Sequence, residues 1–165
     1  MAESFAAQTL PAAKAERYDA LLAEVDSVLE GEVNLVARMA SVASMLASAF
    51  ETFLWTGFYV VDPAAERQLV VGPYQGSLGC LRIVFGKGVC GEVAATLKAL
   101  VVPDVNAFPG HIACDSRSRS EIVVPVLGAH GELIAVLDVD SADLAAFDEI
   151  DRAGLEAIAG RVAVA

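Results

Sequence analysis

Residues 53–61 read Phe53-Leu54-Trp55-Thr56-Gly57-Phe58-Tyr59-Val60-Val61, and here the chain changes from helical to strand periodicity. The stretch is rich in aromatic and β-branched residues, which favour pleated strands. Residues two apart in a strand share one face, so Trp55, Gly57 and Tyr59 are expected to project together. Because aromatic side chains are commonly buried for packing alone, this face is either ordinary core or the wall of a pocket.

Two helical segments precede this strand. Apolar residues recur at spacings of three and four over residues 15–30 and again over 34–50, with Gly31 between the two segments. Residues 1–14 are rich in alanine and show no such period. We therefore expect a mobile N-terminal arm over 1–14 and one folded domain over 15–165.

Five further strands and two helices are predicted after residue 61. Period-two segments bounded by turn residues predict strands over 67–74, 81–85, 99–102, 121–127 and 132–140, the last two joined as a hairpin across 128–131. A short helix is expected over 92–98, and an amphipathic helix closes the chain after Phe147. Two helices, a six-stranded sheet and a closing helix indicate a single α+β domain built in layers.

The composition narrows the classes of partner. The chain has 22 acidic against 11 basic residues and a net charge of −11, which repels phosphate backbones and anionic lipids, so neither nucleic acid nor membrane is an expected partner. The first twenty residues lack the basic start and apolar block of a signal peptide, and the apolar runs are too short to span a bilayer. We therefore expect a cytoplasmic protein, in which cysteines are catalytic or inert more often than structural.

Cys114 lies in a long loop, within Gly110-His111-Ile112-Ala113-Cys114-Asp115, and is followed by a polar segment that cannot form a core strand. Loops of this length in compact domains are often functional, so we expect a reachable thiol. His111, three residues earlier, suggests a cysteine–histidine nucleophile pair, but a histidine in a loop is more often a hydrogen-bonding neighbour.

The other two cysteines have different surroundings. Cys80 follows a flexible run, Gly76-Ser77-Leu78-Gly79, that could carry a thiol toward a partner. Cys90 stands beside Gly91 at the start of a helix, where it is either a small core filler or a functional thiol. The three cysteines form no C-x-x-C pair and the chain has two histidines, so no metal site is expected.

Two carboxylates end the strand over 132–140. Asp138 and Asp140 share one face of that strand. They could cap the segment that follows, but Ser141 and Asp143 are better placed for capping. The pair therefore favours a functional site. Gly86-Lys87-Gly88 lacks the spacing of a phosphate-binding loop.

Several of these segments together resemble a known family. Gly88-Val89-Cys90-Gly91 and Gly131-Glu132-Leu133-Ile134-Ala135-Val136-Leu137-Asp138-Val139-Asp140-Ser141 resemble the GAF domain pattern. Trp55-x-Gly57-Phe58-Tyr59, the spacing of the three cysteines, and the Cys114 loop followed by Ser120-Glu121-Ile122-Val123-Val124-Pro125 are similar to the free methionine-(R)-sulfoxide reductases, which are stand-alone GAF enzymes. The resemblance covers about residues 15–165.

The resemblance implies a fold and an activity. The fold is a GAF-like domain with a six-stranded antiparallel sheet and helices packed mainly on one face. The activity is reduction of free L-methionine (R)-sulfoxide with no cofactor, through a cysteine sulfenic acid and an intramolecular disulfide. The implied reductant is thioredoxin or a similar dithiol. Members of the family are commonly homodimers, so we expect a homodimer here.

The resemblance also implies roles for individual residues. Cys114 matches the catalytic cysteine and Cys80 its resolving partner, while Cys90 matches a third cysteine that could serve as an alternative resolver. Glu121 and Asp138 match carboxylates with a catalytic role. The implied substrate-binding residues are Trp55, Tyr59, Glu121, Asp138, Asp140, Ile112 and Ala113.

Two other functions stay open at this stage. A GAF domain that binds a small ligand without turnover would tolerate loss of the Cys114 thiol. A reductase of methionine sulfoxide within polypeptides would need an open groove, whereas three clustered carboxylates predict a closed pocket that pairs with a free ammonium group.

Overall fold

The structure of this chain is a computed structural model that describes residues 11–163. The elements run α1 (Lys14–Val28), α2 (Leu35–Ala49), β1 (Trp55–Val61), β2 (Gln68–Gln75), β3 (Arg82–Val84), α3 (Gly88–Thr96), β4 (Leu100–Val102), a 3-10 turn (Val105–Ala107), β5 (Ser120–Leu127), β6 (Leu133–Ser141) and α4 (Glu149–Val162). Most of the predicted element bounds agree with these within two residues.

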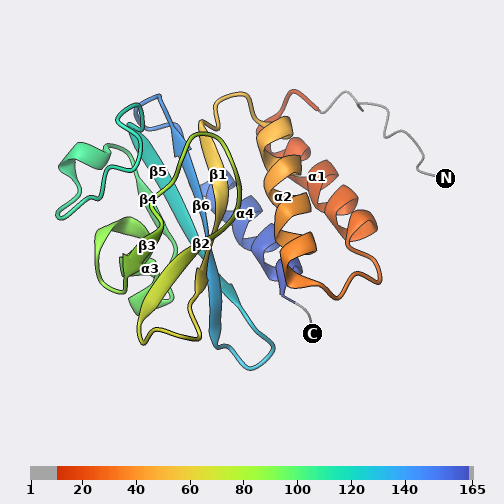
Figure 1. Cartoon of the computed structure of the whole chain (residues 1–165). Helices are drawn as coiled ribbons and strands as arrows, with labels where there is room; N and C mark the ends of the chain where they lie inside the picture. The colour runs from red at the N-terminus through yellow and green to blue at the C-terminus, as the bar shows by residue number, and fades with distance from the viewer. Residues whose placement is uncertain (1–10, 164–165) are drawn as a thin grey trace.

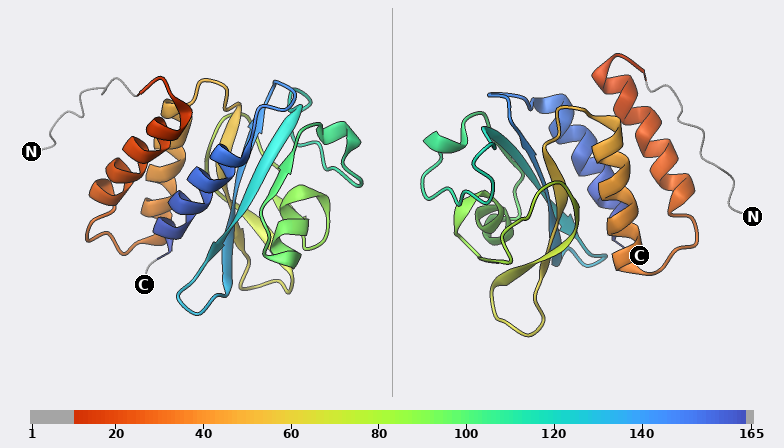
Figure 2. Two further views of the ribbon diagram at one scale, coloured as in Figure 1. Left: turned by 180° about the vertical axis from the view of Figure 1, so that it is seen from behind. Right: turned by 45° about the horizontal axis from the view of Figure 1, so that its top comes forward.

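The six strands form one antiparallel sheet in the order β3-β2-β1-β6-β5-β4. Figure 1 and both views in Figure 2 show α1, α2 and α4 on one face of this sheet, and α3 with the long loops on the other. The predicted α+β architecture, with helices mainly on one face, is confirmed.

Alternation along the strands divides the buried residues into two clusters. Phe58 of β1 and Leu137 of β6 belong to the larger cluster, which α1, α2 and α4 cover. Trp55, Tyr59 and Val136 belong to the smaller cluster on the opposite face, with residues of α3. Because side chains alternate between faces, one strand supplies both the scaffold core and the functional face.

The start of α3 differs from the sequence prediction. The glycine-rich segment 86–91 was expected to be a turn with a helix from Glu92, but α3 begins at Gly88. A Cβ atom on Gly91 would lie 2.4 Å from the backbone oxygen of Val84, so this glycine permits close packing of the helix against the end of β3. The glycine therefore serves packing and does not break the helix.

The predicted N-terminal arm falls mainly on residues 1–10, which lie outside the described residues. Lys14 already begins α1, and its Nζ lies 2.7 Å from Asp151 and 2.9 Å from Asp148 at the start of α4. These contacts join the first described helix to the last.

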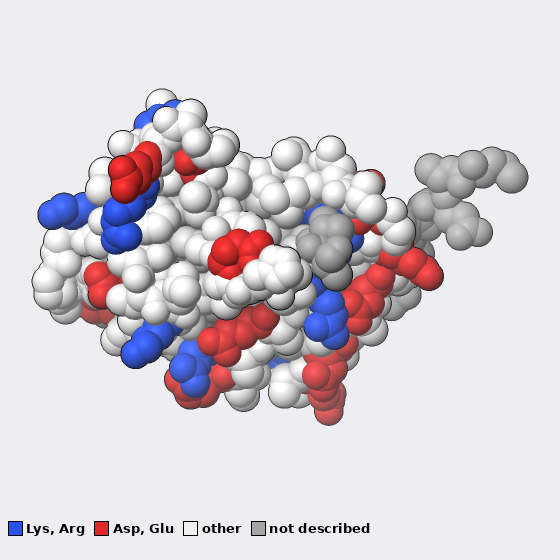
Figure 3. Space-filling view, turned by 90° about the horizontal axis from the view of Figure 1, so that it is seen from below, with Lys and Arg blue, Asp and Glu red and all other residues white. Residues whose placement is uncertain are grey.

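The described surface is predominantly acidic. Figure 3 shows acidic side chains crowding the helical side of one face, with basic side chains scattered among them. A surface of this kind attracts cations and repels polyanions. Within residues 11–163, no helix has both the length and the apolar character needed to cross a membrane.

Candidate active site

Strand register brings three carboxylates together. In the antiparallel pairs, Glu121 of β5 lies opposite Asp140 of β6, and Asp140 in turn lies opposite Trp55 of β1. Asp138 pairs with Gly57 and belongs to the same face as Asp140. The predicted shared face of the two aspartates is thereby present, and the fold adds Glu121 to it.

The aromatic residues of this face form a stack beside the carboxylates. The Trp55 ring stacks on Tyr59 with centroids 5.5 Å apart and on Tyr74 of β2 with centroids 5.1 Å apart. A Cβ atom on Gly57 would lie 2.2 Å from the Tyr74 Cβ, so glycine is what allows β2 to approach here. Tyr74 was not among the predicted site residues.

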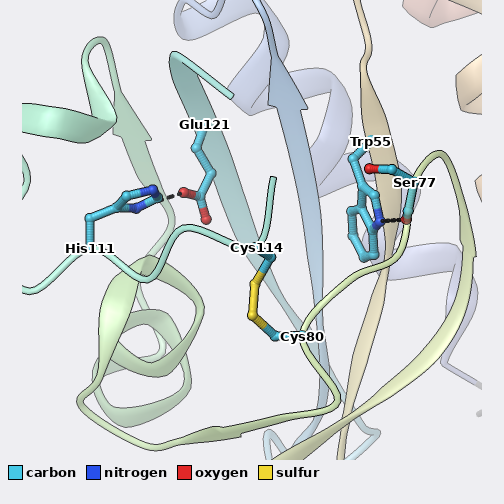
Figure 4. Close-up of a disulfide and its surroundings, with 6 residues drawn as sticks. All are labelled: Trp55, Ser77, Cys80, His111, Cys114 and Glu121. Atoms are coloured by element: carbon cyan, nitrogen blue, oxygen red, sulfur yellow. Dashed lines mark hydrogen bonds and ion pairs between the residues drawn. A yellow bond between two sulfur atoms is a disulfide. The ribbon is translucent and has the colours of Figure 1, made fainter. Parts of the chain in front are cut away.

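Cys80 and Cys114 form a disulfide with their Cα atoms 5.4 Å apart. Figure 4 shows it joining the loop that precedes β3 to the loop that precedes β5. Cys114 is exposed, in agreement with the polar sequence that follows it, whereas Cys90 is a buried free thiol. The chain thus has one accessible sulfur pair and one enclosed sulfur.

Polar contacts hold the two cysteine loops against each other and against the aromatic stack. The indole Nε1 of Trp55 donates to the backbone oxygen of Ser77 at 3.0 Å, and the Ser77 hydroxyl donates to Asp115 at 2.5 Å. Asp115 is also paired with Arg117 at 2.7 Å. Arg117 and Ser77 together lower the pKa of the Asp115 carboxyl. An ionised Asp115 therefore ties the Cys114 loop to the Cys80 loop.

Burial dominates the electrostatics of the three carboxylates. Glu121 and Asp138 are each 5% exposed, and burial together with the neighbouring acids raises the pKa of both well above its ordinary value. Burial also raises the pKa of Asp140, to about 6, although a hydrogen bond from Ser118 opposes the shift. Burial therefore favours the protonated forms of Glu121 and Asp138, whereas Asp140, with a pKa of about 6, ionises near neutral pH.

Cys90 lies against this cluster. Its sulfur and one oxygen each of Glu121 and Asp138 are all within 4.8 Å of one another. Burial raises the pKa of the Cys90 thiol well above its ordinary value, and the Asp138 and Glu121 carboxyls add to the shift. A buried neutral thiol of this kind is a poor nucleophile.

His111 enters the site in a way that the sequence did not predict. Its Nδ1 lies 3.8 Å from the Glu121 Oε2, as Figure 4 shows, and burial lowers the pKa of the imidazole. The ring is therefore directed toward a carboxyl group of the cluster.

The predicted site residues other than Cys80 and Ala113 line one pocket with His111, and Cys80 is joined to that pocket through its disulfide with Cys114. Sequence reasoning missed several lining residues, because they are ordinary apolar or loop residues with no chemical signature. The missed residues are Leu78, Gly79, Ile83, Lys87, Gly88, Val89, Asp115 and Ser118.

Replacing Asp138 by asparagine is expected to stabilise the fold. Because the pKa of Asp138 is raised on folding, the unfolded chain releases this proton at lower pH, and stability falls as the pH rises above the unfolded pKa of about 3.9. An asparagine amide has no proton to lose, so the variant avoids this loss of stability at high pH. The free energy of unfolding should rise by about 1–3 kcal/mol at pH 8 and by less at pH 5, as measured by urea denaturation.

The exposed Asp143 supplies the matched control, since its side chain makes no contact with the cluster. Asp143→Asn should leave stability unchanged at both pH values. A destabilised Asp138→Asn protein at pH 8 would contradict the assignment of Asp138 as a strained, buried acid.

The sequence of the chain matches a family model and two known proteins over most of its length. The GAF domain family model matches residues 16–165. The chain is 41% identical over 150 residues to the free methionine-R-sulfoxide reductase of Saccharomyces cerevisiae, covering 88% of this chain and 83% of that protein. It is 36% identical over 149 residues to the free methionine-R-sulfoxide reductase of Escherichia coli, covering 90% and 88%.

A solved structure has the same fold. The free methionine-R-sulfoxide reductase of Neisseria meningitidis in complex with its substrate superposes with a TM-score of 0.90 at 45% identity, covering 96% of this chain and 93% of that one. The alignment therefore spans nearly the whole of both chains.

Proposed function

This chain belongs to the free methionine-R-sulfoxide reductases of the GAF domain family, and from that membership we propose that it reduces free L-methionine (R)-sulfoxide to methionine. The observation that carries the proposal is the meeting of an exposed sulfur pair with a buried acid cluster and an aromatic wall in one pocket. A sensor domain needs neither a sulfur pair nor a proton donor.

The first chemical step is oxygen transfer to Cys114. The Cys114 sulfur attacks the sulfoxide sulfur while a carboxyl group donates a proton to the sulfoxide oxygen, which is otherwise a poor leaving group. The oxygen is transferred to Cys114 as a sulfenic acid, and methionine leaves with two more electrons than the substrate had. The thiol proton restores the carboxyl group, so the step is balanced in protons.

The second step closes the disulfide. The Cys80 thiol displaces the sulfenic oxygen as water, and the Cys80–Cys114 bond forms. The 5.4 Å Cα separation supports this pairing, since disulfides need Cα atoms within about 7 Å. Cys90 is then an alternative resolver only after a movement that would expose it.

The acids divide their roles according to their protonation. Glu121 and Asp138, whose protonated forms are favoured by burial, serve as the proton donors. Asp140, with a pKa of about 6, is the ionised group that pairs with the substrate ammonium. The amine of a methionine residue inside a polypeptide is an uncharged amide, so this pairing selects the free amino acid.

The remaining lining residues hold the rest of the substrate. Trp55 and Tyr59 enclose the S-methyl group, with sulfur–aromatic contacts worth about 0.3–1.5 kcal/mol each. Ile112 lines the pocket beside Cys114 and contacts the substrate there, whereas Ala113 does not line it and keeps no assigned role. The cavity beside the disulfide is about 30 Å³, room for roughly two waters, so the sulfoxide enters once the disulfide is reduced.

The disulfide is reopened by an external dithiol such as thioredoxin. The exposure of Cys114 supports this, because thiol–disulfide exchange requires direct access to one of the two sulfurs. A homodimer and a cytoplasmic location remain predictions of the sequence. The direct test is a thioredoxin-coupled assay of NADPH oxidation with the (R) and (S) epimers of free methionine sulfoxide. Consumption with the (R) epimer alone is expected, and absence of turnover with both would reject the proposed activity.

The affinity for the sulfoxide should depend on the ionisation of Asp140. Its protonation below a pKa of about 6 removes the charge that pairs with the ammonium, so affinity should fall by up to tenfold per pH unit below that value. Calorimetry on the Cys114→Ser protein measures this without turnover. Asp140→Asn should bind weakly with no such dependence between pH 5 and 7, and an unchanged pH profile in this variant would exclude Asp140 as the titrating group.

A further inference from the structure

Cys90, Glu121, Asp138 and His111 present four potential metal ligands to one small space. The Cys90 sulfur and one oxygen from each acid lie within 4.8 Å of one another, and the three residues are between 4% and 5% exposed. The His111 Nδ1 lies 3.8 Å from a Glu121 oxygen. These donors come from α3, β5, β6 and the Cys114 loop, so only the folded chain assembles them.

Two of the donor atoms have no partner. Asp138 Oδ1 and His111 Nδ1 are buried, and neither makes a hydrogen bond within the part of the chain that the structure describes. A buried polar atom without a hydrogen-bond partner costs about 1–3 kcal/mol of stability, so the two atoms destabilise the ion-free site. Asp138 and His111 both line the pocket, so a species that enters it can supply the missing partners.

We propose that Cys90, Glu121, Asp138 and His111 form a binding site for a thiophilic divalent cation of the Zn²⁺ class, and that the bound ion excludes substrate. Sulfur, imidazole nitrogen and carboxylate oxygen are the ligands that Zn²⁺ prefers in a tetrahedral site. Ligand atoms around such an ion are separated by about 3.3–3.8 Å when the bonds are 2.0–2.3 Å. The atoms of Cys90, Glu121 and Asp138, which lie within 4.8 Å of one another, reach that spacing with side-chain shifts of about 1 Å, and the His111 Nδ1 approaches the group from the Glu121 side.

The size and charge of the pocket suit an ion. The cavity of about 30 Å³ accommodates one ion with a water, even while the disulfide is closed. The chain has a net charge of −11, which draws cations toward an acid-lined pocket.

The consequence for activity rests on the proposed function. An ion held by Glu121 and Asp138 occupies the proton donors and takes the place that the sulfoxide group would have beside them. Sequence spacing excluded a zinc motif, because the ligands are not adjacent along the chain. A bound ion therefore inhibits the enzyme from inside the substrate pocket.

Metal binding is best tested on the disulfide form of the full-length protein. Cys90 is then its only free thiol, so a metal–thiolate signal must come from Cys90. Titration with Co²⁺ should produce a near-ultraviolet thiolate-to-cobalt charge-transfer band that saturates at one equivalent, and Zn²⁺ should abolish it. Cys90→Ala should remove the band, Asp138→Asn should weaken binding by at least about tenfold, and Asp143→Asn should leave it unchanged. No band, or one that survives in Cys90→Ala, overturns the site.

Inhibition is measured separately. Zn²⁺ should raise the KM of the reduced enzyme for the sulfoxide without lowering kcat, and the effect should be lost in Cys90→Ala. Because the cobalt band needs no turnover, its presence upholds the ion site even if the proposed activity fails. Cobalt binding without competition would overturn the inhibitory role and would count against this pocket as the substrate site.

Discussion

Replacement of Cys114 by serine is expected to abolish methionine formation, with kcat/KM falling by at least about 10⁴-fold. A serine hydroxyl cannot accept the sulfoxide oxygen and then release it to a thiol, so both chemical steps are lost. Removal of a nucleophile in other enzymes has effects of this size or larger. The measurement is methionine released by pre-reduced enzyme, quantified over single and multiple turnovers.

The same assay should distinguish the roles of the two other cysteines. Cys80→Ser should release about one equivalent of methionine per enzyme and then stop with thioredoxin as reductant, because Cys114 remains as a sulfenic acid. Cys90→Ala should continue through many turnovers, because Cys90 is buried and takes no part in the disulfide. Full turnover by Cys80→Ser together with a stalled Cys90→Ala would reverse the assignment of the resolving thiol.

Much of the fold was predictable because the hydrophobic period is a local property. The change of period at Phe53, the two preceding helices and the alternation along the strands are all visible within short windows of sequence. Alternation also predicted that Trp55 shares a face with Tyr59, and both lie in the cluster that lines the pocket. These inferences need no knowledge of which strands pair.

The meeting of Glu121 with the aspartates depends on a detail that no local pattern reveals. At the hairpin end of the β5–β6 pair, Leu127 lies opposite Leu133, a register that would continue to Glu121 opposite Val139. A one-residue shift between Val126 and Leu127 changes this, so that Glu121 lies opposite Asp140. Because one residue exchanges the two faces of a strand, the irregularity is what places Glu121 on the functional face.

The aromatic stack and His111 illustrate the same limit. Gly57 was predicted to share a face with Trp55 and Tyr59, and in the structure Tyr74 of the neighbouring strand packs against it. His111 was considered as a partner for Cys114, but its Nδ1 is directed at Glu121 across the pocket. Both contacts join residues of different segments, which no local period connects. A single sequence shows which residues are present, but it does not show the strand register that brings them together.

Removing the ammonium group from the substrate should reduce kcat/KM by at least about 10²-fold. Leaving one member of a buried ion pair without its partner costs about 3–5 kcal/mol, and each 1.4 kcal/mol is a factor of ten. The suitable probe is 4-(methylsulfinyl)butanoate, which lacks the amine and adds no bulk, so that a loss cannot be attributed to steric exclusion. The ratio of the wild-type kcat/KM values for the two compounds measures the free energy that the ammonium contact contributes.

The matched variants locate that contact. In Asp140→Asn, free methionine sulfoxide should lose most of its advantage, so that the two compounds react within roughly tenfold of each other, because the amide carries no charge for the ammonium to satisfy. Asp143→Asn, at an exposed position just beyond the end of β6, should keep the full wild-type ratio. A ratio that is unchanged in Asp140→Asn would move ammonium recognition away from Asp140. A wild-type enzyme that accepts both compounds equally would remove the physical basis for its preference for the free amino acid.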